Sequence, residues 1–522
     1  MKYRFYDKGG SAMKSIRLRL ASLMLASLVL TGCGGAQDSL PAAGTAGVPA
    51  AQQTTAAGEF VLPYTAAEGF NPYLTDSALT LQNSRLLYDS LVEITGNFEL
   101  EYEVAQSVVS SGTTVEIRVE GSFADGSAIT GADVAASIEA ARTSTLFGGR
   151  FAGVQTVRAA GDLVTLTLSE PDSLFAYLLD IPVMRASEVG QSAPASSGRY
   201  SLAEDERGAY LVANESFDPP AGLETIRLEE IGGYDAMVSA LNIGAISLFA
   251  SEQEADLAGS NICNTAYYNL NNLVFLGIQA IGEDSPLAQP AMRRAINLAI
   301  SRRQIADRAY YSRAYVATGV INPRFPGQAQ AATLAEEPDL EEAAALIESL
   351  GYTLDEASGY YQDAGGNRLS FTLLCYSGSS FKRYTATLIA QQLAECGIEV
   401  TVQEEADFAV YHDRILSGQA PLYIGEVKLY NNMDMDVFFS DGGDARTGLA
   451  LSEELLAAYD GFKADSGALA AFENAFAAQM PFIPLVFKNG VVTYAKGWSG
   501  LDPTVSDVFY QLEQLTAVTT TQ

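Results

Sequence analysis

The chain has 522 residues, of which 48% are hydrophobic and 18% charged, so it is long enough for several domains with sizeable cores. Its 63 acidic residues outnumber its 31 basic residues, and the formal charge at pH 7 is -32. Because phosphate binding depends on clustered basic side chains, this balance excludes nucleic acid as an expected partner.

The first residues have the pattern of an export signal. Lys14, Arg17 and Arg19 precede an apolar run over 20–30. That run is shorter than the roughly 20 residues that a membrane-spanning helix needs. We therefore expect a cleavable signal peptide over 1–32.

The apolar run ends in the sequence LTGC at 30–33, which resembles the lipobox of bacterial lipoproteins. In those proteins the cysteine thiol receives a diacylglycerol, so the resemblance implies a lipid anchor on Cys33. The following residues are rich in Ala, Gly, Thr and Gln and have no apolar periodicity. We expect 33–57 to be a flexible tether that holds a folded body near a membrane.

The first predicted elements of that body are two strands and a helix. Apolar and polar residues alternate over 115–119 and again over 164–168, which is the period of a half-buried strand. Between them, Thr130 with Asp133 three residues later has the form of a capping box. It predicts the start of a helix whose apolar residues share one face.

Three longer helices are predicted in the second half of the chain. Apolar residues recur at helical spacing over 292–300, 340–350 and 382–395. Gly351 and Gly397 follow the last two, at the position where a left-handed residue ends a helix.

Two shorter elements are predicted next to these helices. Ser301 with Gln304 predicts a fresh helix start, and the apolar alternation over 398–402 predicts a strand. This irregular mixture of helices and strands indicates a mixed α/β protein with more than one sheet.

Cysteine and histidine are scarce. After Cys33 only Cys263, Cys375 and Cys396 remain, so the alternatives are isolated buried thiols or a single bridge, most locally Cys375–Cys396. His412 is the one histidine, and a Ser-His-Asp triad or a multi-histidine metal site would rest on it alone. We expect His412 to be exposed or packed, the protein not to be an enzyme, and no metal or cofactor to be needed.

Several segments together resemble the family 5 extracellular solute-binding proteins, which are the peptide, dipeptide and nickel receptors of ABC importers. The most specific is the Asp-Gly turn that leads into a capped helix. In chain order the matching segments are FNPY at 70–73, LLYDSLV at 86–92, AQS at 105–107, FADGSAITGADV at 123–134, SGRY at 197–200, MRRAINLAISR at 292–302 and MPFIPL at 480–485.

The resemblance implies a two-lobed α/β fold of the periplasmic-binding-protein type (type II), with a small extra domain inserted in the first lobe. The two lobes would close on a ligand around a hinge. The expected division is lobe I over 58–74, 196–262 and 486–522, the inserted domain over 75–195, and lobe II over 263–485.

In peptide-binding members a carboxylate in a "DYPDP"-like loop pairs with the α-ammonium of the ligand. Here the corresponding stretch departs from the pattern, because Asn431 falls where that anchor is expected. Nearby charged and aromatic residues are the substitutes, although Glu426 and Lys428 can also pair with each other, and Asp434 and Asp436 can also form a surface turn. The candidate ligand-binding residues are Tyr73, Glu426, Lys428, Tyr430, Asp434 and Asp436.

The implied function is that of a monomeric lipoprotein on the outer face of the cell membrane, which captures a peptide or peptide-like solute and delivers it to the permease of an ABC importer. Two alternatives remain open. The same fold serves sensory lipoproteins without a transport role, and the ligand can be a sugar or a metal chelate.

Overall fold

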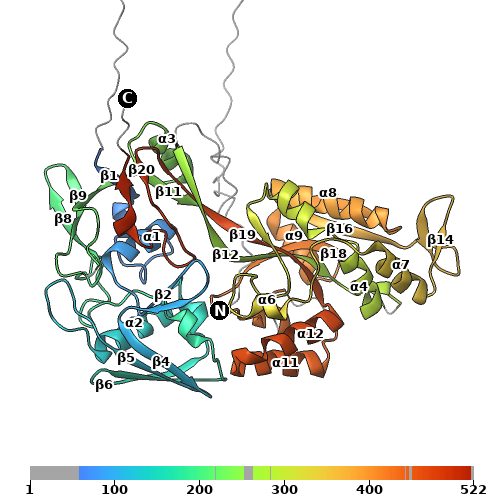
Figure 1. Cartoon of the computed structure of the whole chain (residues 1–522), viewed down its shortest axis with the longest axis horizontal. Coiled ribbons are helices and arrows are strands. Elements are labelled where there is room, and N and C mark those ends of the chain that lie inside the picture. Colours follow the sequence, from blue (N-terminus) through green and yellow to red (C-terminus); the bar gives the residue numbers. More distant parts are fainter. Residues whose placement is uncertain are drawn as a thin grey trace, which may run out of the picture.

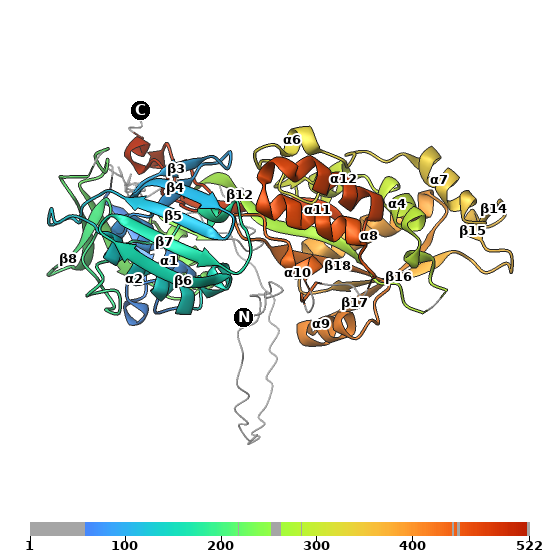
Figure 2. The ribbon, with the colours of Figure 1, turned by 90° about the horizontal axis from the view of Figure 1, so that it is seen from below.

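The computed structural model describes residues 58–217, 219–251, 263–282, 284–440, 443–445 and 449–518. The predicted signal peptide, Cys33 and the tether over 33–57 lie outside these residues. Figures 1 and 2 show two lobes lying end to end, joined by the long strands β12 (Cys263–Ile278) and β19 (Phe482–Ala495). Among the described helices, none is both long enough and apolar enough to span a bilayer.

The first lobe is built on the four-stranded sheet β1-β10-β9-β8. β1 (Phe60–Tyr64) pairs in parallel with β10 (Thr225–Glu230), although the two are far apart in the chain. β8 (Tyr200–Asp205) and β9 (Gly208–Ala213) complete it as an antiparallel hairpin. The lobe also contains α1 (Ala78–Leu87), β2 (Val92–Ile94), β3 (Leu100–Tyr102), α3 (Tyr234–Asn242), β11 (Leu248–Ser251), β20 (Trp498–Ser499) and β21 (Thr516–Ala517).

A second four-stranded sheet, β4-β5-β7-β6, lies at one end of the first lobe. The strands predicted over 115–119 and 164–168 are confirmed as two of its members, and their apolar residues are buried in alternation. The predicted capping box is confirmed at Thr130. The elements are β4 (Ala105–Ser111), β5 (Thr114–Val119), α2 (Gly131–Thr143), β6 (Val154–Ala160) and β7 (Leu163–Leu168).

The second lobe is organised around the larger sheet β11-β19-β12-β18-β16-β17, with β13 (Ala314–Val316) paired to β19. β16 (Ser370–Tyr376) pairs in parallel with both β17 (Glu399–Glu405) and β18 (Leu422–Lys428). The helices are α4 (Pro290–Leu298), α5 (Arg302–Gln304), α6 (Gln328–Ala331), α7 (Leu340–Ser349), α8 (Ser380–Glu395), α9 (Phe408–Leu416), α10 (Asp436–Phe439), α11 (Glu453–Ala464) and α12 (Leu469–Gln479), and a small hairpin joins β14 (Thr353–Asp355) to β15 (Tyr360–Gln362).

The three longer helices predicted in this lobe are confirmed as α4, α7 and α8. Gly351 and Gly397 have φ angles of 90° and 80°, as a left-handed helix end requires. Ser301 also begins a helix, and its hydroxyl accepts from the backbone N–H of Gln304. That helix soon widens into a π-helix over Ile305–Ala309, which the sequence pattern did not predict.

The pairing of β12 with β19 breaks register between Asn269 and Leu273, where three residues of β12 oppose one residue of β19. On one side of the break, β19 also pairs with β11, and Tyr268 and Leu270 belong to the first lobe's core. On the other side β12 pairs with β18, and Leu273 belongs to the second lobe's core. The irregularity therefore lies where the two strands leave one lobe and enter the other.

The three cysteines of the folded part are free thiols. Cys375 and Cys396 are both buried in the second lobe's core, and Cys263 is half-buried. The bridge between Cys375 and Cys396 is therefore absent, and the alternative of isolated thiols is correct. His412 lies on α9 with its ring stacked on Phe408, the packed role expected of it.

Candidate ligand-binding site

The two lobes meet along a surface that we call the interlobe seam. Residues 170–180 of the first lobe and 429–436 of the second form its centre, and the residues that contact them from either lobe belong to it. Part of it is apolar, because Phe98 and Tyr177 of the first lobe pack on Phe325 of the second, with ring centroids 6.0 and 5.3 Å apart. The remainder is polar and carries most of the charged groups described below.

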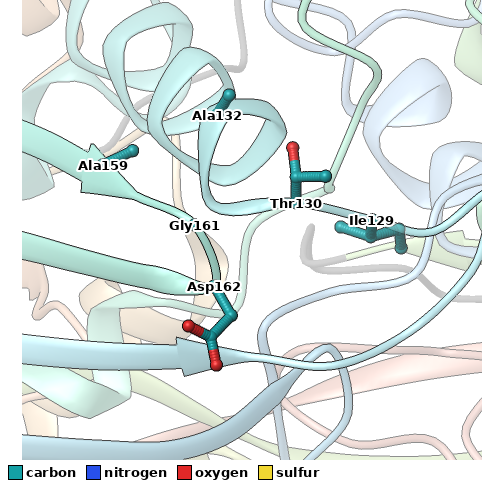
Figure 3. A pocket seen from close by; sticks show the side chains of 6 residues that line it. All are labelled: Ile129, Thr130, Ala132, Ala159, Gly161 and Asp162. Carbon is teal, nitrogen blue, oxygen red and sulfur yellow. The ribbon is translucent and has the colours of Figure 1, made fainter.

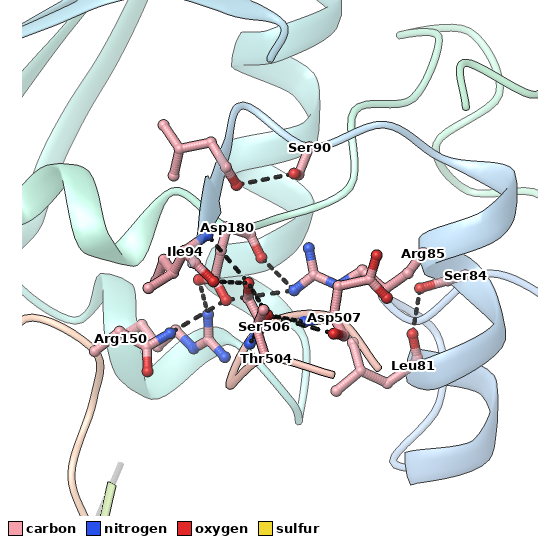
Figure 4. Close-up of polar contacts among 12 residues, drawn as sticks. Leu81, Ser84, Arg85, Ser90, Ile94, Arg150, Asp180, Thr504, Ser506 and Asp507 are labelled. Atoms are coloured by element: carbon pink, nitrogen blue, oxygen red, sulfur yellow. Dashed lines mark hydrogen bonds and ion pairs between the residues drawn. The ribbon is translucent and has the colours of Figure 1, made fainter. Parts of the chain in front are cut away.

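On the first lobe, Asp180 is held between two arginines (Figure 4). Arg85 of α1 donates to its Oδ2 at 3.3 Å, and Arg150 donates to its Oδ1 at 2.5 Å. The Asp180 side chain is only 1% exposed. Two guanidinium groups around one carboxylate leave this part of the seam with a net positive charge.

A chain of buried amides connects Asp180 to the second lobe. Asn322 donates to the side-chain oxygen of Asn271, and Asn271 donates to that of Asn431, both at 2.9 Å. Asn431 in turn donates to Oδ2 of Asp180 at 3.2 Å. Since Asn271 lies inside the register break of β12, the point where the strands cross between lobes is tied directly to the seam.

On the second lobe, Glu426 of β18 is buried between two lysines. Lys382 of α8 and Lys488 of β19 approach its two oxygens at 3.0 and 3.1 Å, and Asn272 also donates to it at 3.0 Å. Burial alone would raise the pKa of Glu426, but the two ammonium groups outweigh it and the pKa lies well below its ordinary value. Glu426 is therefore ionised, and the cluster has one more positive than negative charge.

The positions of Lys382 and Lys488 bear on whether Glu426 pairs with Lys428, which the sequence left open. The Glu426 carboxylate is neutralised by Lys382 and Lys488, which are distant in the chain, and not by a simple pairing with Lys428 on the same strand. Lys428 is half-buried at the end of β18, opposite Asn272 of β12. It therefore stands next to the seam.

Asp434 and Asp436 lie in the loop and helix that follow β18. Both accept a hydrogen bond from the buried hydroxyl of Tyr459 on α11, at 3.0 and 2.9 Å. Lys463, also on α11, joins Asp436 at 3.2 Å to Glu170 of the first lobe at 3.0 Å. The two aspartates are therefore part of a tied structure at the seam rather than a free surface turn.

A second polar contact across the seam lies beside the group of Asp434, Asp436 and Lys463. Asn432 donates to Oδ2 of Asp172 at 2.9 Å across the seam. Asp172 is half-buried, and its burial raises its pKa to about 6 against the opposing effect of the Asn432 amide. The seam thus carries an acidic end at Asp172, Asp434 and Asp436, which Lys463 offsets in part, and a basic end at Arg85, Arg150, Lys382 and Lys488.

The two candidate tyrosines have different surroundings. Tyr73 is buried in the first lobe, where its hydroxyl donates to the carbonyl of Pro182 and its ring meets Phe147 edge-on at 5.5 Å. Tyr430 reaches across the seam to Gly149, and a methyl group added at Gly149 would overlap the Tyr430 hydroxyl. Tyr73 therefore supports the Asp180 region from behind, whereas Tyr430 takes part in the contact between lobes.

The structure thus brings five of the six candidates to one strand and the loop after it, with Tyr73 on the opposite lobe. Sequence reasoning missed the residues that balance their charges. The sequence carried one usable signal, because Arg85 is the one charged residue of α1. The missed residues are Arg85, Arg150, Asp180, Lys382, Lys463 and Lys488.

A shallow pocket of about 360 Å³ between the start of α2 and the β6–β7 turn does not belong to the seam (Figure 3). Its lining contains one charged side chain, Asp162, beside small and apolar residues. Over the residues that the structure covers, no group of three or more His, Cys, Asp or Glu side chains is arranged to hold a metal ion.

Two lobes joined by strands with a register break, and meeting at a charged seam, define a binding protein of the type that closes around a solute. A family model for bacterial extracellular solute-binding proteins, family 5 Middle, matches residues 99–446. The chain therefore belongs to the family 5 bacterial extracellular solute-binding proteins, and the resemblance seen in the sequence is confirmed.

Known proteins agree with this assignment. The oligopeptide-binding protein AppA of Bacillus subtilis is 22% identical over 422 residues, which cover 75% of this chain and 76% of AppA. The nickel-binding periplasmic protein of Escherichia coli is 24% identical over 42% of this chain and 44% of its own length. The structure of a nickel ABC transporter protein from Bacillus halodurans superposes with a TM-score of 0.71 at 18% identity, covering 86% and 98% of the two chains.

The expected two-lobed α/β fold is confirmed by this structural match. The expectation of an extracellular solute-binding protein that serves ABC import is confirmed at the level of the family.

Proposed function

We propose that the protein captures a short peptide or peptide-like solute at the interlobe seam and delivers it to the permease of an ABC importer. The observation that supports a zwitterionic ligand is the separation of charge along the seam. A ligand carboxylate suits the end where Asp180 and Glu426 are each outnumbered by their basic partners. A ligand ammonium suits the end at Asp172, Asp434 and Asp436.

The six candidate residues have distinct roles in this proposal. Lys428 binds the ligand carboxylate, since it lies at the seam beside the cluster of Glu426, Lys382 and Lys488, which has a net positive charge. Asp434 and Asp436 receive the ligand ammonium, and Tyr430 covers the ligand from the second lobe. Tyr73 acts by positioning the first-lobe arginines. We take the two lobes on either side of the β12–β19 register break as the bodies that move.

Binding then works by differential affinity. A solute that contacts both lobes stabilises the closed arrangement by the difference between its affinities for the closed and open states. We place the hinge at the register break in β12, because three of its residues face a single residue of β19 and the strand bends there between the two lobes.

A thermal-shift screen tests the ligand class. We expect di- to pentapeptides to raise the melting temperature more than free amino acids or sugars do. The nickel-binding relative makes metal chelates the second candidate, because the carboxylates of a chelator also fit the basic end of the seam. Stabilisation by sugars or metal chelates alone would show that the peptide assignment is wrong.

The role of Lys428 is tested by Lys428→Ala, which we expect to weaken the binding of a carboxylate-bearing ligand by about 1–3 kcal/mol. Arg414→Ala on α9 is the matched control, because it removes a basic side chain that bonds to Gln403 at an exposed site. Equal affinities for the wild type and Lys428→Ala would remove Lys428 from the site.

We also propose that the mature protein is a monomer anchored to the outer face of the cell membrane through a lipid on Cys33. The LTGC sequence and the family's extracellular location support this. Cys33→Ala should release the protein from the membrane fraction and abolish incorporation of labelled fatty acid. Retention of the label in that variant would contradict the anchor.

A further inference from the structure

A cavity of about 190 Å³ opens on the first lobe, behind Asp180 and away from the seam. It lies between α1, the β2–β3 hairpin, the turn before β8 and the C-terminal segment near 510–513. Carboxylates dominate its lining: Asp89, Glu93, Glu101, Glu103 and Glu513. Two arginines, Arg85 and Arg199, also border it.

The two arginines offset these carboxylates only in part, because each also has an acidic partner elsewhere. Arg85 bonds to Asp180 (Figure 4), and Arg199 bonds to the buried Asp507 at 3.0 Å. Five carboxylates against two shared arginines therefore leave the cavity with an excess of acidic groups.

Two of the carboxylates are in an arrangement that costs stability when the cavity is empty. Glu93 of β2 and Glu101 of β3 are direct cross-strand partners, and like charges in that position would repel, so ionising both is unfavourable. Glu93 is 7% exposed, and its Oε2 is buried without a hydrogen-bond partner. Its burial raises its pKa well above the ordinary value, and the nearby Asp507 adds to this effect.

Aromatic side chains complete the wall. Tyr510 donates its hydroxyl to Glu101 at 2.9 Å, and Tyr88 and Phe217 also line the cavity. Carboxylates combined with aromatic faces are the surroundings that bind ammonium groups. The carboxylates do not converge on a common point in the way that a metal ion requires, since the described residues contain no such cluster.

We propose that this cavity is a second binding site, separate from the seam, which takes a small organic cation with a primary ammonium group. The ammonium donates to Glu93 and its neighbours, and its positive charge stabilises their ionised forms. The aromatic walls and the spread of the carboxylates favour an extended amine, such as an alkyl diamine, over a metal ion.

The test is a calorimetric and thermal-shift titration of the purified full chain with putrescine. Butane-1,4-diol is the neutral probe of the same length, and calcium chloride and sodium chloride at matched ionic strength are the ionic controls. We expect saturable binding of putrescine and no saturable binding of the other three.

Glu93→Gln should weaken putrescine binding at least about tenfold, as expected for the loss of a charge-assisted hydrogen bond. It should also raise the melting temperature of the protein without putrescine. Glu99→Gln removes the same charge from an exposed position outside the cavity, and its affinity should stay within about twofold of the wild type.

Asp89→Asn provides a second lining variant if Glu93→Gln fails to fold, and it should weaken binding in the same direction. The proposal is wrong if sodium chloride matches the effect of putrescine, if calcium binds in its place, or if both lining variants bind putrescine as tightly as the wild type.

Discussion

At the scale of single residues, Glu426 is the charge on which the second-lobe side of the seam depends. Glu426→Gln leaves Lys382 and Lys488 buried without a counter-charge, so we expect a loss of about 3–5 kcal/mol in the free energy of unfolding. Urea denaturation of the variant and the wild type measures this difference in the free energy of unfolding. Glu404→Gln is the control, because its ion pair with Arg383 is 3.9 Å long and half exposed, and its removal should cost no more than about 1 kcal/mol.

Glu473 makes stability depend on pH. It is fully buried in the second lobe, accepts from the backbone N–H groups of Val320 and Ile321, and burial raises its pKa to about 7. A raised folded pKa gives a stabilising contribution that is complete below about pH 4.5 and is lost as the pH rises through about 7. Asp89 and Asp172, whose pKa values are raised to about 7 and about 6, act in the same direction.

We therefore expect the chain to be less stable at pH 8 than at pH 5. In Glu473→Gln the difference between these two pH values should shrink by about 3 kcal/mol. Urea midpoints at the two pH values measure it. An unchanged difference in the variant would contradict the raised pKa.

The sequence allowed Glu426 to be proposed as a site residue, but not its surroundings. Its lysine partners come from α8 and β19, 44 and 62 residues away, and only the folded sheet brings them together. The same applies to Asp180, whose partners Arg85 and Arg150 come from different elements. Long-range charge pairs have no local spacing, so a pattern search does not find them.

At the scale of elements, the capping box of α2 also ties the start of this helix to the segment at Ala186. Oδ2 of Asp133 accepts from the backbone N–H of Thr130 at 2.9 Å, while Oδ1 accepts from the N–H of Ala186 at 2.9 Å. Asp133→Ala should therefore cost about 1–3 kcal/mol.

Hydrogen exchange is the suitable measurement, because the loss should appear in α2 and its sheet and not in the second lobe. Asp125→Ala is the control in the same region, since that carboxylate is 58% exposed and bonds to Ser127 and Arg185. Equal protection of α2 in Asp133→Ala and the wild type would contradict the role of the cap.

Elements with a strong local signal could be predicted. The strands at 115–119 and 164–168 and the helices α2, α4, α7 and α8 each have a clear period or a capping residue. The register break in β12 has no such signal, because it depends on how the strand pairs with β19 more than 200 residues later. The π-helix after Ser301 is likewise set by packing and not by local propensity.

At the scale of the whole molecule, Gly149 lies where the two lobes approach each other tightly around Tyr430. A methyl group there would overlap the hydroxyl of Tyr430 across the seam. Gly149→Ala should therefore disfavour the closed state and weaken ligand binding about tenfold or more. Adding Tyr430→Phe removes the overlapping atom and should restore most of the affinity.

Gly153→Ala is the matched control, because its added methyl group would make only an ordinary contact with Ser169. Titration calorimetry with a peptide identified by thermal shift gives the affinities. If Gly149→Ala binds as tightly as Gly153→Ala, the seam does not close as described.

The most direct test of the account is small-angle X-ray scattering of the purified protein with and without a stabilising peptide. If the two lobes close around a solute at the β12–β19 register break, the radius of gyration should fall on peptide addition to the value calculated from the structure. An identical radius in both states, at a peptide concentration where calorimetry shows full occupancy, would contradict closure.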